Sequence, residues 1–306
     1  MYLPFFALSY GLGALVYYVE KAQLAPGTSL WAFIFPKDVW MHRSARQDYA
    51  VALINMALAA NIFPYLVLNY DFYKDAILSG IGQLAPHADS NPTDKPGGFA
   101  IVVFTLLSFM LSDLFYYWSH RLTHRVMFLW EFHKLHHSAE VMTPVTLHRA
   151  HPIDILFNVG MRMMGLGVAS AIFYALYPNN HGLLTITGSN LFLIICYVAG
   201  ANLRHSHIWL SYGPTIERVM MSPAQHQIHH STDPAHFNRN YGADLSFWDW
   251  VFGSLYIPRE RENVTFGLGD QHDNGQSLWQ LYVSPFRKSA RILHRRFKKP
   301  RQSSRI

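Results

Sequence analysis

Cysteine is almost absent from this chain of 306 residues, in which Cys196 is the only one. A disulfide within the chain is therefore impossible. A zinc site or an iron–sulfur cluster built from several thiolates is excluded as well. One cysteine inside an apolar run does not decide the redox compartment.

Charged residues are also scarce, at 14% of the chain against about 25% in soluble domains. Half of the residues are hydrophobic and 15% are aromatic. The mean hydropathy is nevertheless only +0.06, too low for a bundle of membrane spans from end to end. This balance indicates several membrane helices combined with a polar domain.

Several catalytic motifs are missing. Without HExxH, a zinc-dependent membrane protease is not expected, and without ExxH the chain lacks the pattern of carboxylate di-iron bundles. There is also no GxGxxG and no P-loop. Nothing in the sequence resembles a nicotinamide, flavin or haem module. If the chain is a redox enzyme, its electrons therefore come from a partner.

What the chain does contain is histidine, 18 in all, with eight of them in three boxes: HRLTH (120–124), HKLHH (133–137) and HQIHH (226–230). The spacings i, i+3 and i, i+4 bring side chains to neighbouring positions on a helix, where imidazoles can clamp a transition metal. A single histidine is usually a packing or surface residue, but metal ligation explains the joint spacing better. The eight are His120, His124, His133, His136, His137, His226, His229 and His230.

Eight imidazoles exceed what one tetrahedral ion uses, so we expect two adjacent metals. Imidazole alone does not choose among iron, zinc, copper and nickel.

Five apolar runs are long enough, or nearly so, to cross a bilayer. They cover residues 2–19, 49–70, 99–117, 153–177 and 182–203. We expect an all-α integral membrane protein with about four to five transmembrane helices, a kink at Pro64 and a cytoplasmic helical domain that holds the histidine boxes. The first run lacks the basic flank and cleavage site of a signal peptide, which favours a retained helix.

The charges of the connecting segments give an orientation. Segment 71–98, rich in Gly, Pro and Asp, is expected to be a loop on the outside, while 20–47 carries four basic residues and is expected inside. This places every histidine box and the basic C-terminal tail in the cytoplasm. The expected divisions are N-terminal helices and loops at 1–98, a catalytic domain at 99–260 and the tail at 261–306.

The tail has nine Lys and Arg residues between positions 287 and 306. Contact with anionic lipid is favoured over nucleic-acid binding, because no basic stripe elsewhere extends a nucleic-acid footprint. We therefore expect no nucleic-acid partner.

The boxes stand where spans end, so their metals would face a cavity open to lipid. Two redox metals beside a lipid chain suit O₂ activation followed by hydrogen abstraction from an unactivated C–H bond. The alternative is a non-catalytic membrane protein that binds or transports zinc. A transporter, however, needs its ligands near the midplane of discontinuous spans.

The three boxes and their flanks resemble the fatty acid hydroxylase/sterol desaturase superfamily of membrane-bound di-iron oxygenases, over roughly residues 99–260. The flanks are DLFYYW before the first box, FLWEF before the second and the closing NYGADLSFWDWVFGSLYIP. The HxxxH spacing of the first box is similar to that of the hydroxylases and sterol desaturases.

This resemblance implies that all eight box histidines are metal ligands, with His205 as a further one. The element LHRAHPID resembles the HxxHP motif of sterol-desaturase-like members, which makes His151, and less surely His148, additional candidates as ligands or as partners of ligands. His207 lies two residues after His205 and would point elsewhere on a helix, so it is not a candidate. The histidines at 42, 87, 181, 236, 272 and 294 fit no box and are expected at the surface or in interfaces.

The resemblance also implies two iron ions, O₂ as co-substrate and a lipid substrate, with a sterol-like or isoprenoid ring slightly favoured over an acyl chain. Hydroxylation and desaturation both stay open. A separate ferredoxin or cytochrome with its reductase is the expected electron donor.

Neutral imidazoles do not compensate the charge of the metals, so a carboxylate is expected nearby. Asp113 either accepts a hydrogen bond from an imidazole N–H or, as an acid inside a helix, bonds to a neighbouring span. Asp244 and Asp249 are further candidates.

Overall fold

The computed structural model describes residues 3–66, 69–82, 96–177, 185–186, 189–269 and 277–298. Within these ranges the regular secondary structure is almost entirely helical, as predicted. The exception is one antiparallel pair of two-residue strands, β1 (Thr185–Ile186) and β2 (Ser189–Asn190).

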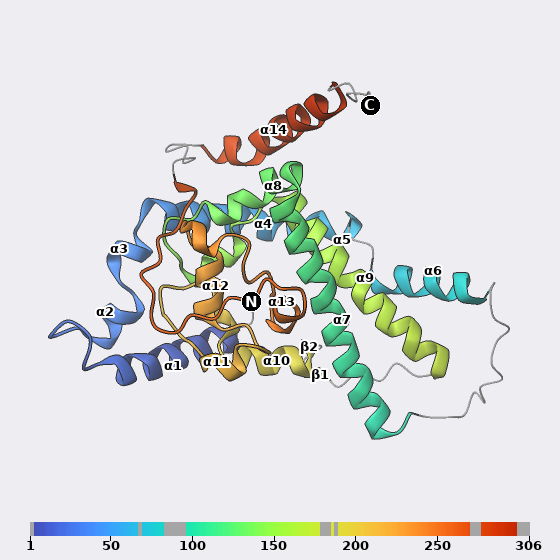
Figure 1. Ribbon diagram of the computed structural model, residues 1–306, viewed down its shortest axis with the longest axis horizontal. Helices are drawn as coiled ribbons and strands as arrows, with labels where there is room; N and C mark the ends of the chain where they lie inside the picture. Colours follow the sequence, from blue (N-terminus) through green and yellow to red (C-terminus); the bar gives the residue numbers. More distant parts are fainter. Residues whose placement is uncertain are drawn as a thin grey trace, which may run out of the picture.

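Two long helices lie side by side along the right of Figure 1, α7 (Gly98–Arg125) and α9 (Pro152–Leu176). Both are long and apolar enough to cross a membrane, at about 42 and 37 Å. This agrees with the third and fourth predicted spans. Gly165 permits the close approach of the two helices, because a Cβ at that position would lie 2.5 Å from the carbonyl oxygen of Leu111.

The second predicted span is bent. Helix α4 (Arg43–Asn61) ends at Ile62, and the following stretch from Phe63, which includes α5 (Phe63–Leu66), continues at 56° to it. The bend expected at Pro64 is therefore present two residues earlier. If the bent pair counts as one crossing, the described residues contain three candidate spans, and otherwise two, fewer than the four to five expected.

Two sequence expectations are wrong in this region. The segment 71–98 is not a loop throughout, because α6 (Tyr70–Gly82) packs along α9; the remainder of that segment up to residue 95 lies outside the described residues. The run 182–203 is not one span either. It contains α10 (Leu191–Val198), which is only about 12 Å long. This helix ends before Gly200, whose φ is 110°, and a separate short helix, η2 (Ala201–Leu203), follows.

The first predicted span is a helix, α1 (Leu3–Glu20), of about 27 Å, slightly short of a 30 Å hydrocarbon core. Two short helices, α2 (Leu30–Ile34) and α3 (Lys37–Trp40), connect it to α4.

Short helices carry the remaining polar part of the chain. These are α8 (Met127–His137), η1 (Pro144–His148), α11 (Gly213–Ile216), α12 (Pro223–His229), η3 (Pro234–His236) and α13 (Phe247–Val251). The tail is not simply a basic extension, because it forms α14 (Leu278–Lys298), which packs on α8 at the top of Figure 1.

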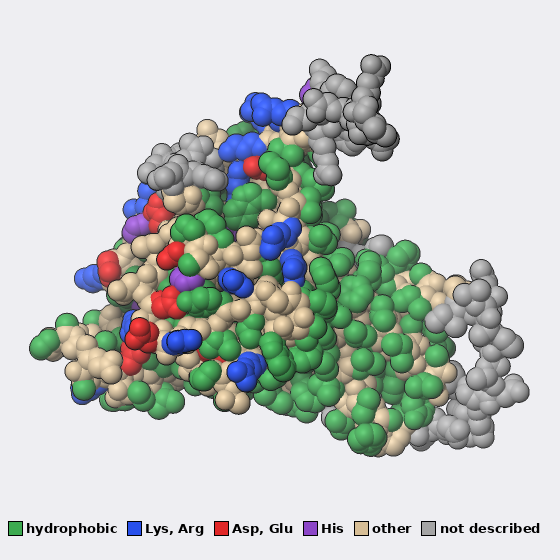
Figure 2. All heavy atoms as spheres, viewed as in Figure 1, with side chains coloured by type: hydrophobic (Ala, Val, Ile, Leu, Met, Phe, Trp, Pro, Cys, Tyr) green, Lys and Arg blue, Asp and Glu red, His purple; other side chains and the backbone are tan. Residues whose placement is uncertain are grey.

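The surface of the molecule has a hydrophobic side over the long helices and a charged side over the short ones. In Figure 2 the side of α7 and α9 at the lower right is hydrophobic, whereas charged side chains gather on the left and at the top. This separation supports an integral membrane protein whose polar part stands beside one end of the long helices.

Candidate metal centre

Three short stretches bring the histidine boxes together. The chain leaves α7 just after HRLTH, turns at the extended residue Val126 and enters α8, which ends with HKLHH. Helix α12 carries HQIHH and begins with a capping box, in which Ser222 Oγ accepts from the backbone N–H of Gln225 and Gln225 Oε1 accepts from that of Ser222. Pro223, at the first helical position, suits this start.

Five imidazoles form a first group, with one nitrogen of each within 4.8 Å of all the others. The Nε2 atom of His133 lies 3.1 Å from that of His120 and 3.2 Å from that of His137. The members are His120, His124, His133, His137 and His229.

Four buried imidazoles form a second group that meets the same criterion. The Nε2 atom of His205 lies 3.0 Å from that of His136 and 2.9 Å from that of His226, which is 3.2 Å from that of His230. The members are His136, His205, His226 and His230.

The two groups adjoin each other. The rings of His137 and His230 stack with their centroids 4.4 Å apart, and those of His229 and His230 are 5.4 Å apart. Each HxxHH box contributes to both groups, because HKLHH gives His136 to the second group and HQIHH gives His229 to the first. The histidine boxes that suggested two metals therefore form two clusters of nitrogen atoms whose imidazole rings are in contact with each other.

The donor sets fit metal ions. Two nitrogens bound at right angles to one ion at about 2.1 Å would lie about 3 Å apart, which matches the observed separations. In the described part of the chain, Nε2 of His124 and of His229 are buried without a hydrogen-bond partner. Burial lowers the pKa of His136 to about 4 and that of His229 to about 3. These imidazoles are therefore neutral at pH 7, which is the form that binds metals.

Hydrogen bonds on the far side of four rings fix their orientation. In each, Nδ1–H donates outward, so that Nε2 points into its group, as is usual for histidines that bind metals. The pairs are His120 with the carbonyl of Tyr241 (2.7 Å), His133 with Oδ2 of Asp154 (3.0 Å), His136 with the carbonyl of Arg149 (3.2 Å) and His229 with the carbonyl of Arg239 (2.8 Å).

Sequence reasoning missed Asp154, the one carboxylate among these acceptors. It stands in the first turn of α9, where Asn158 also donates to it, and both it and His133 are buried. Its only signal in the sequence was its place two residues after the HP pair. Asp113, which was considered for this role, instead accepts the backbone N–H groups of Asp244 and Leu245, both at 3.1 Å.

The other two candidate acids, Asp244 and Asp249, bond to residues that neighbour or contact the histidines rather than to the imidazoles themselves. Asp244 forms an ion pair with Arg204, the neighbour of His205. Asp249 accepts the backbone N–H groups of Tyr241 and Gly242 at 2.8 and 2.7 Å, and so fixes the carbonyl that receives the hydrogen bond of His120. Burial raises the pKa of Asp249 to about 6.

His151 and His148 belong to neither group. His151 caps α9: its Nδ1 accepts from the backbone N–H of Ile153 and its Nε2 donates to the carbonyl of Tyr282, so neither nitrogen faces the clusters. His148 lies at the end of η1, and its carbonyl accepts from the side chain of Asn55.

The histidines outside the boxes have varied positions. His207 donates to a backbone carbonyl, His42 is half-buried and lies 3.7 Å from Glu140, and His294 is exposed. His236, expected at the surface or in an interface, is instead buried and lies 3.0 Å from Glu262. The residues at 87, 181 and 272 lie outside the described ones.

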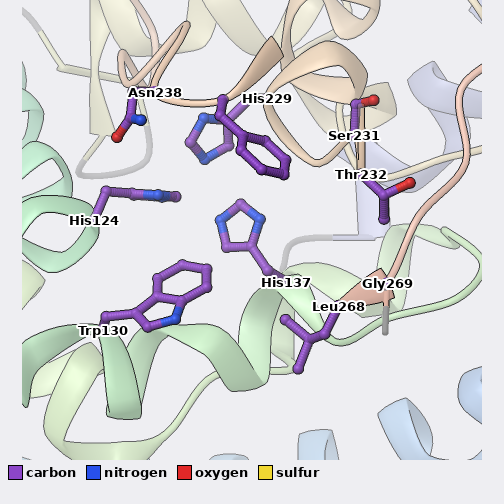
Figure 3. A pocket seen from close by; sticks show the side chains of 11 residues that line it. His124, Trp130, His137, His229, Ser231, Thr232, Asn238, Leu268 and Gly269 are labelled. Carbon is purple, nitrogen blue, oxygen red and sulfur yellow. The ribbon is translucent and has the colours of Figure 1, made fainter. Parts of the chain in front are cut away.

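A cavity of about 550 Å³ opens onto the first group (Figure 3). His124, His137 and His229 point into it, with Trp130 close by. The remaining wall consists of Ser231, Thr232, Phe237, Asn238, Gly267, Leu268 and Gly269. A second cavity of about 390 Å³, with an entirely apolar lining, lies where α7, α10 and the residues around Met220 and Leu245 meet.

Comparison with known proteins agrees with this geometry. A family model described as fatty acid hydroxylase matches residues 105–254, which include every histidine of the two groups. An ornithine lipid hydroxylase of Rhizobium tropici is 28% identical over 208 residues, 68% of this chain and 56% of that protein. A delta(7)-sterol 5(6)-desaturase of Gibberella zeae is 30% identical over 250 residues, 81% of this chain and 67% of that protein.

An alkylglycerol monooxygenase of Xenopus tropicalis is 28% identical over 163 residues, or 53% of this chain. The alignments span about half of the length of the ornithine lipid hydroxylase and a third of that of the monooxygenase. No solved structure matches the chain.

Proposed function

Because this chain belongs to the fatty acid hydroxylase family, we propose that it is a membrane-bound oxidoreductase that uses O₂ to oxidise a C–H bond of a lipid. The observation that carries the proposal is the pair of adjoining imidazole groups, five and four strong. The relatives support it, since they are named as hydroxylases, monooxygenases and desaturases.

We assign one iron ion to each group. His120, His124, His133, His137 and His229 would hold the first, and His136, His205, His226 and His230 the second. Bound iron supplies the redox chemistry that activates O₂. The chain's own contribution is orientation, because the four outward hydrogen bonds fix the tautomer of these imidazoles with Nε2 facing inward.

The cavity in Figure 3 is the place we assign to the reacting part of the lipid. Its volume of about 550 Å³ lies in the range of small-molecule sites. Trp130 and Leu268 offer apolar walls, while Ser231, Thr232 and Asn238 offer hydrogen-bonding groups. A lipid segment with both an apolar and a polar part suits this lining.

The balance of the reaction is the same for every substrate. Hydroxylation converts R–H, O₂, two electrons and two protons into R–OH and water. Desaturation removes two hydrogen atoms from the lipid and yields two waters from the same inputs. The position of the lipid decides between these outcomes. The HPID element does not favour a ring substrate, because it supplies a helix cap and Asp154 rather than a contact with the cavity.

The remaining parts of the proposal concern the surroundings. We assign the histidine groups and α14 to the cytoplasmic side, and the two electrons to a separate ferredoxin or cytochrome with its reductase. Zinc binding or transport is not favoured, since the relatives carry names of redox enzymes and the imidazoles cluster where α7 ends.

The test uses the full chain, purified in lipid nanodiscs, loaded with iron and supplied with a reductant, isotopically labelled O₂ and a lipid extract of its host. We expect lipids that have gained one labelled oxygen or lost two hydrogens. His205→Ala should abolish them, whereas His207→Ala, at a half-buried histidine outside both groups, should not. Oxygen consumption without either product would refute the proposal.

A further inference from the structure

Helix α14 presents basic side chains on the outside of the molecule (Figure 2, top). Arg287, Arg291 and Arg295 are exposed and Lys288 is half-buried, and the helix contains no acidic residue. None of the four forms an ion pair in the part of the chain that the structure describes. We call these four residues the α14 basic surface.

Packing holds α14 firmly on α8, the helix that carries HKLHH. Leu281 is buried against Leu135, and Ser289 Oγ donates to the carbonyl of Phe128 at 2.8 Å. His151 adds a hydrogen bond of 3.0 Å to the carbonyl of Tyr282. The basic surface therefore has a fixed position relative to the histidine groups.

An aromatic contact leads from this surface towards those groups. Phe286, which precedes Arg287, is 49% exposed. Its ring centroid lies 5.2 Å from that of Phe132, which is buried and directly precedes His133 of the first group. A molecule seated on the α14 basic surface would thus touch a ring that contacts the helix of the candidate ligands.

The position of α14 favours a partner in the aqueous phase over the bilayer. Figure 1 places α14 beyond α8, at the end of the molecule away from the N-terminal half of α7, and Figure 2 shows the hydrophobic surface at the opposite end. A bilayer around α7 and α9 would lie on that hydrophobic side. The features of α14 that lipid would also bind are Trp279, which is 73% exposed, and the basic side chains themselves if the lipid is anionic.

We propose that the α14 basic surface is the docking site of an acidic, soluble one-electron carrier, of which two reduced molecules dock in succession in each turnover and each is oxidised by one electron. The inference rests on the proposed function, because only a redox enzyme needs such a carrier. Complementary charge steers an acidic protein to this surface, and the hydrophobic contact at Phe286 orients it.

Binding is measured directly, with the full chain in nanodiscs and without turnover. The probes are an acidic plant-type ferredoxin and the soluble domain of cytochrome b5. The test variant reverses three charges, Arg287→Glu, Lys288→Glu and Arg291→Glu together. The matched control reverses two exposed charges outside α14, Arg218→Glu and Arg259→Glu.

We expect at least one probe to bind the wild type, more weakly as salt is raised, and to bind the triple variant at least about tenfold more weakly. The control variant should bind as the wild type does. Equal binding by the triple variant, or no binding of either probe by the wild type, would overturn the proposal.

A second arm compares nanodiscs of zwitterionic lipid with nanodiscs that contain phosphatidylglycerol. If the triple variant changes only the response of thermal stability to the anionic lipid, the surface binds the bilayer and the proposal is wrong. Carrier binding without any oxidised lipid would leave the docking site in place and refute the proposed function, so the two failures are distinguishable.

Discussion

Replacement of Asp154 tests how the protein holds its imidazoles. The carboxylate accepts the Nδ1–H of His133 at 3.0 Å with both side chains buried, which fixes the tautomer and makes Nε2 a stronger ligand. Loss of such an outer partner weakens metal binding by about 10- to 100-fold, or roughly 1.4–2.8 kcal/mol. Asp154→Asn keeps an oxygen acceptor but loses the charge, so we expect about tenfold, whereas Asp154→Ala loses both and should approach 100-fold.

The assay is competition for metal with a chromogenic chelator, on protein purified in detergent and checked for folding. Asp113→Asn is the matched control, because Asp113 is also buried on a long helix but bonds to backbone N–H groups rather than to an imidazole. It should lower thermal stability with a smaller effect on metal affinity than either Asp154 variant. Wild-type affinity in both Asp154 variants would refute the role given to this carboxylate.

Three further predictions concern ligands, packing and pH. His205→Ala should lower the metal content by one ion per chain, whereas His151→Ala should leave it unchanged and cost about 1 kcal/mol of stability through the lost cap of α9; equal metal loss in both would contradict the ligand set. Gly165→Ala should destabilise the fold by about 1–3 kcal/mol and so lower the thermal unfolding temperature, because its Cβ would meet the backbone of Leu111. An unchanged unfolding temperature would show that α7 and α9 do not touch there. The metal-free protein should lose stability as the pH falls from about 6.5 towards 4. Over this range the histidines of the unfolded chain take up protons, whereas buried ones such as His229, with a pKa of about 3, do not. An unfolding temperature that stays constant over this range would contradict the burial of the histidines.

The histidine boxes were predictable because local periodicity decides them. Residues three and four positions apart on a helix are neighbours whatever the tertiary structure, so the spacing predicted which imidazoles of one box lie together. That the boxes and His205 meet was an inference from the family resemblance. The sequence did not show how HKLHH and HQIHH divide between the two groups, because that depends on how α8 and α12 pack.

Long-range contacts account for the misses. Asp154 reaches His133 only because α9 starts beside α8, and Asp113 reaches residues 244 and 245, which are 131 and 132 positions away. His151 looked like a ligand because HP pairs occur in related motifs, yet the same residue type caps a helix equally well. No periodicity within the chain separates these uses of one side chain.

The errors in helix assignment have physical causes too. Hydropathy made one span of 182–203, although Gly200, in the left-handed region at φ 110°, lies within it. The Gly- and Pro-rich composition of 71–98 is concentrated after residue 79, so it hid the helix Tyr70–Gly82 before it. In α14 the many charges obscured the apolar positions, such as Leu281, that pack on α8.

The most direct test of the whole account is the metal content and coordination of the purified, iron-loaded protein, measured by elemental analysis together with X-ray absorption at the iron edge. The account predicts two iron ions per chain with imidazole nitrogen as the dominant ligand. A single ion per chain, or coordination dominated by carboxylate oxygen, would contradict it.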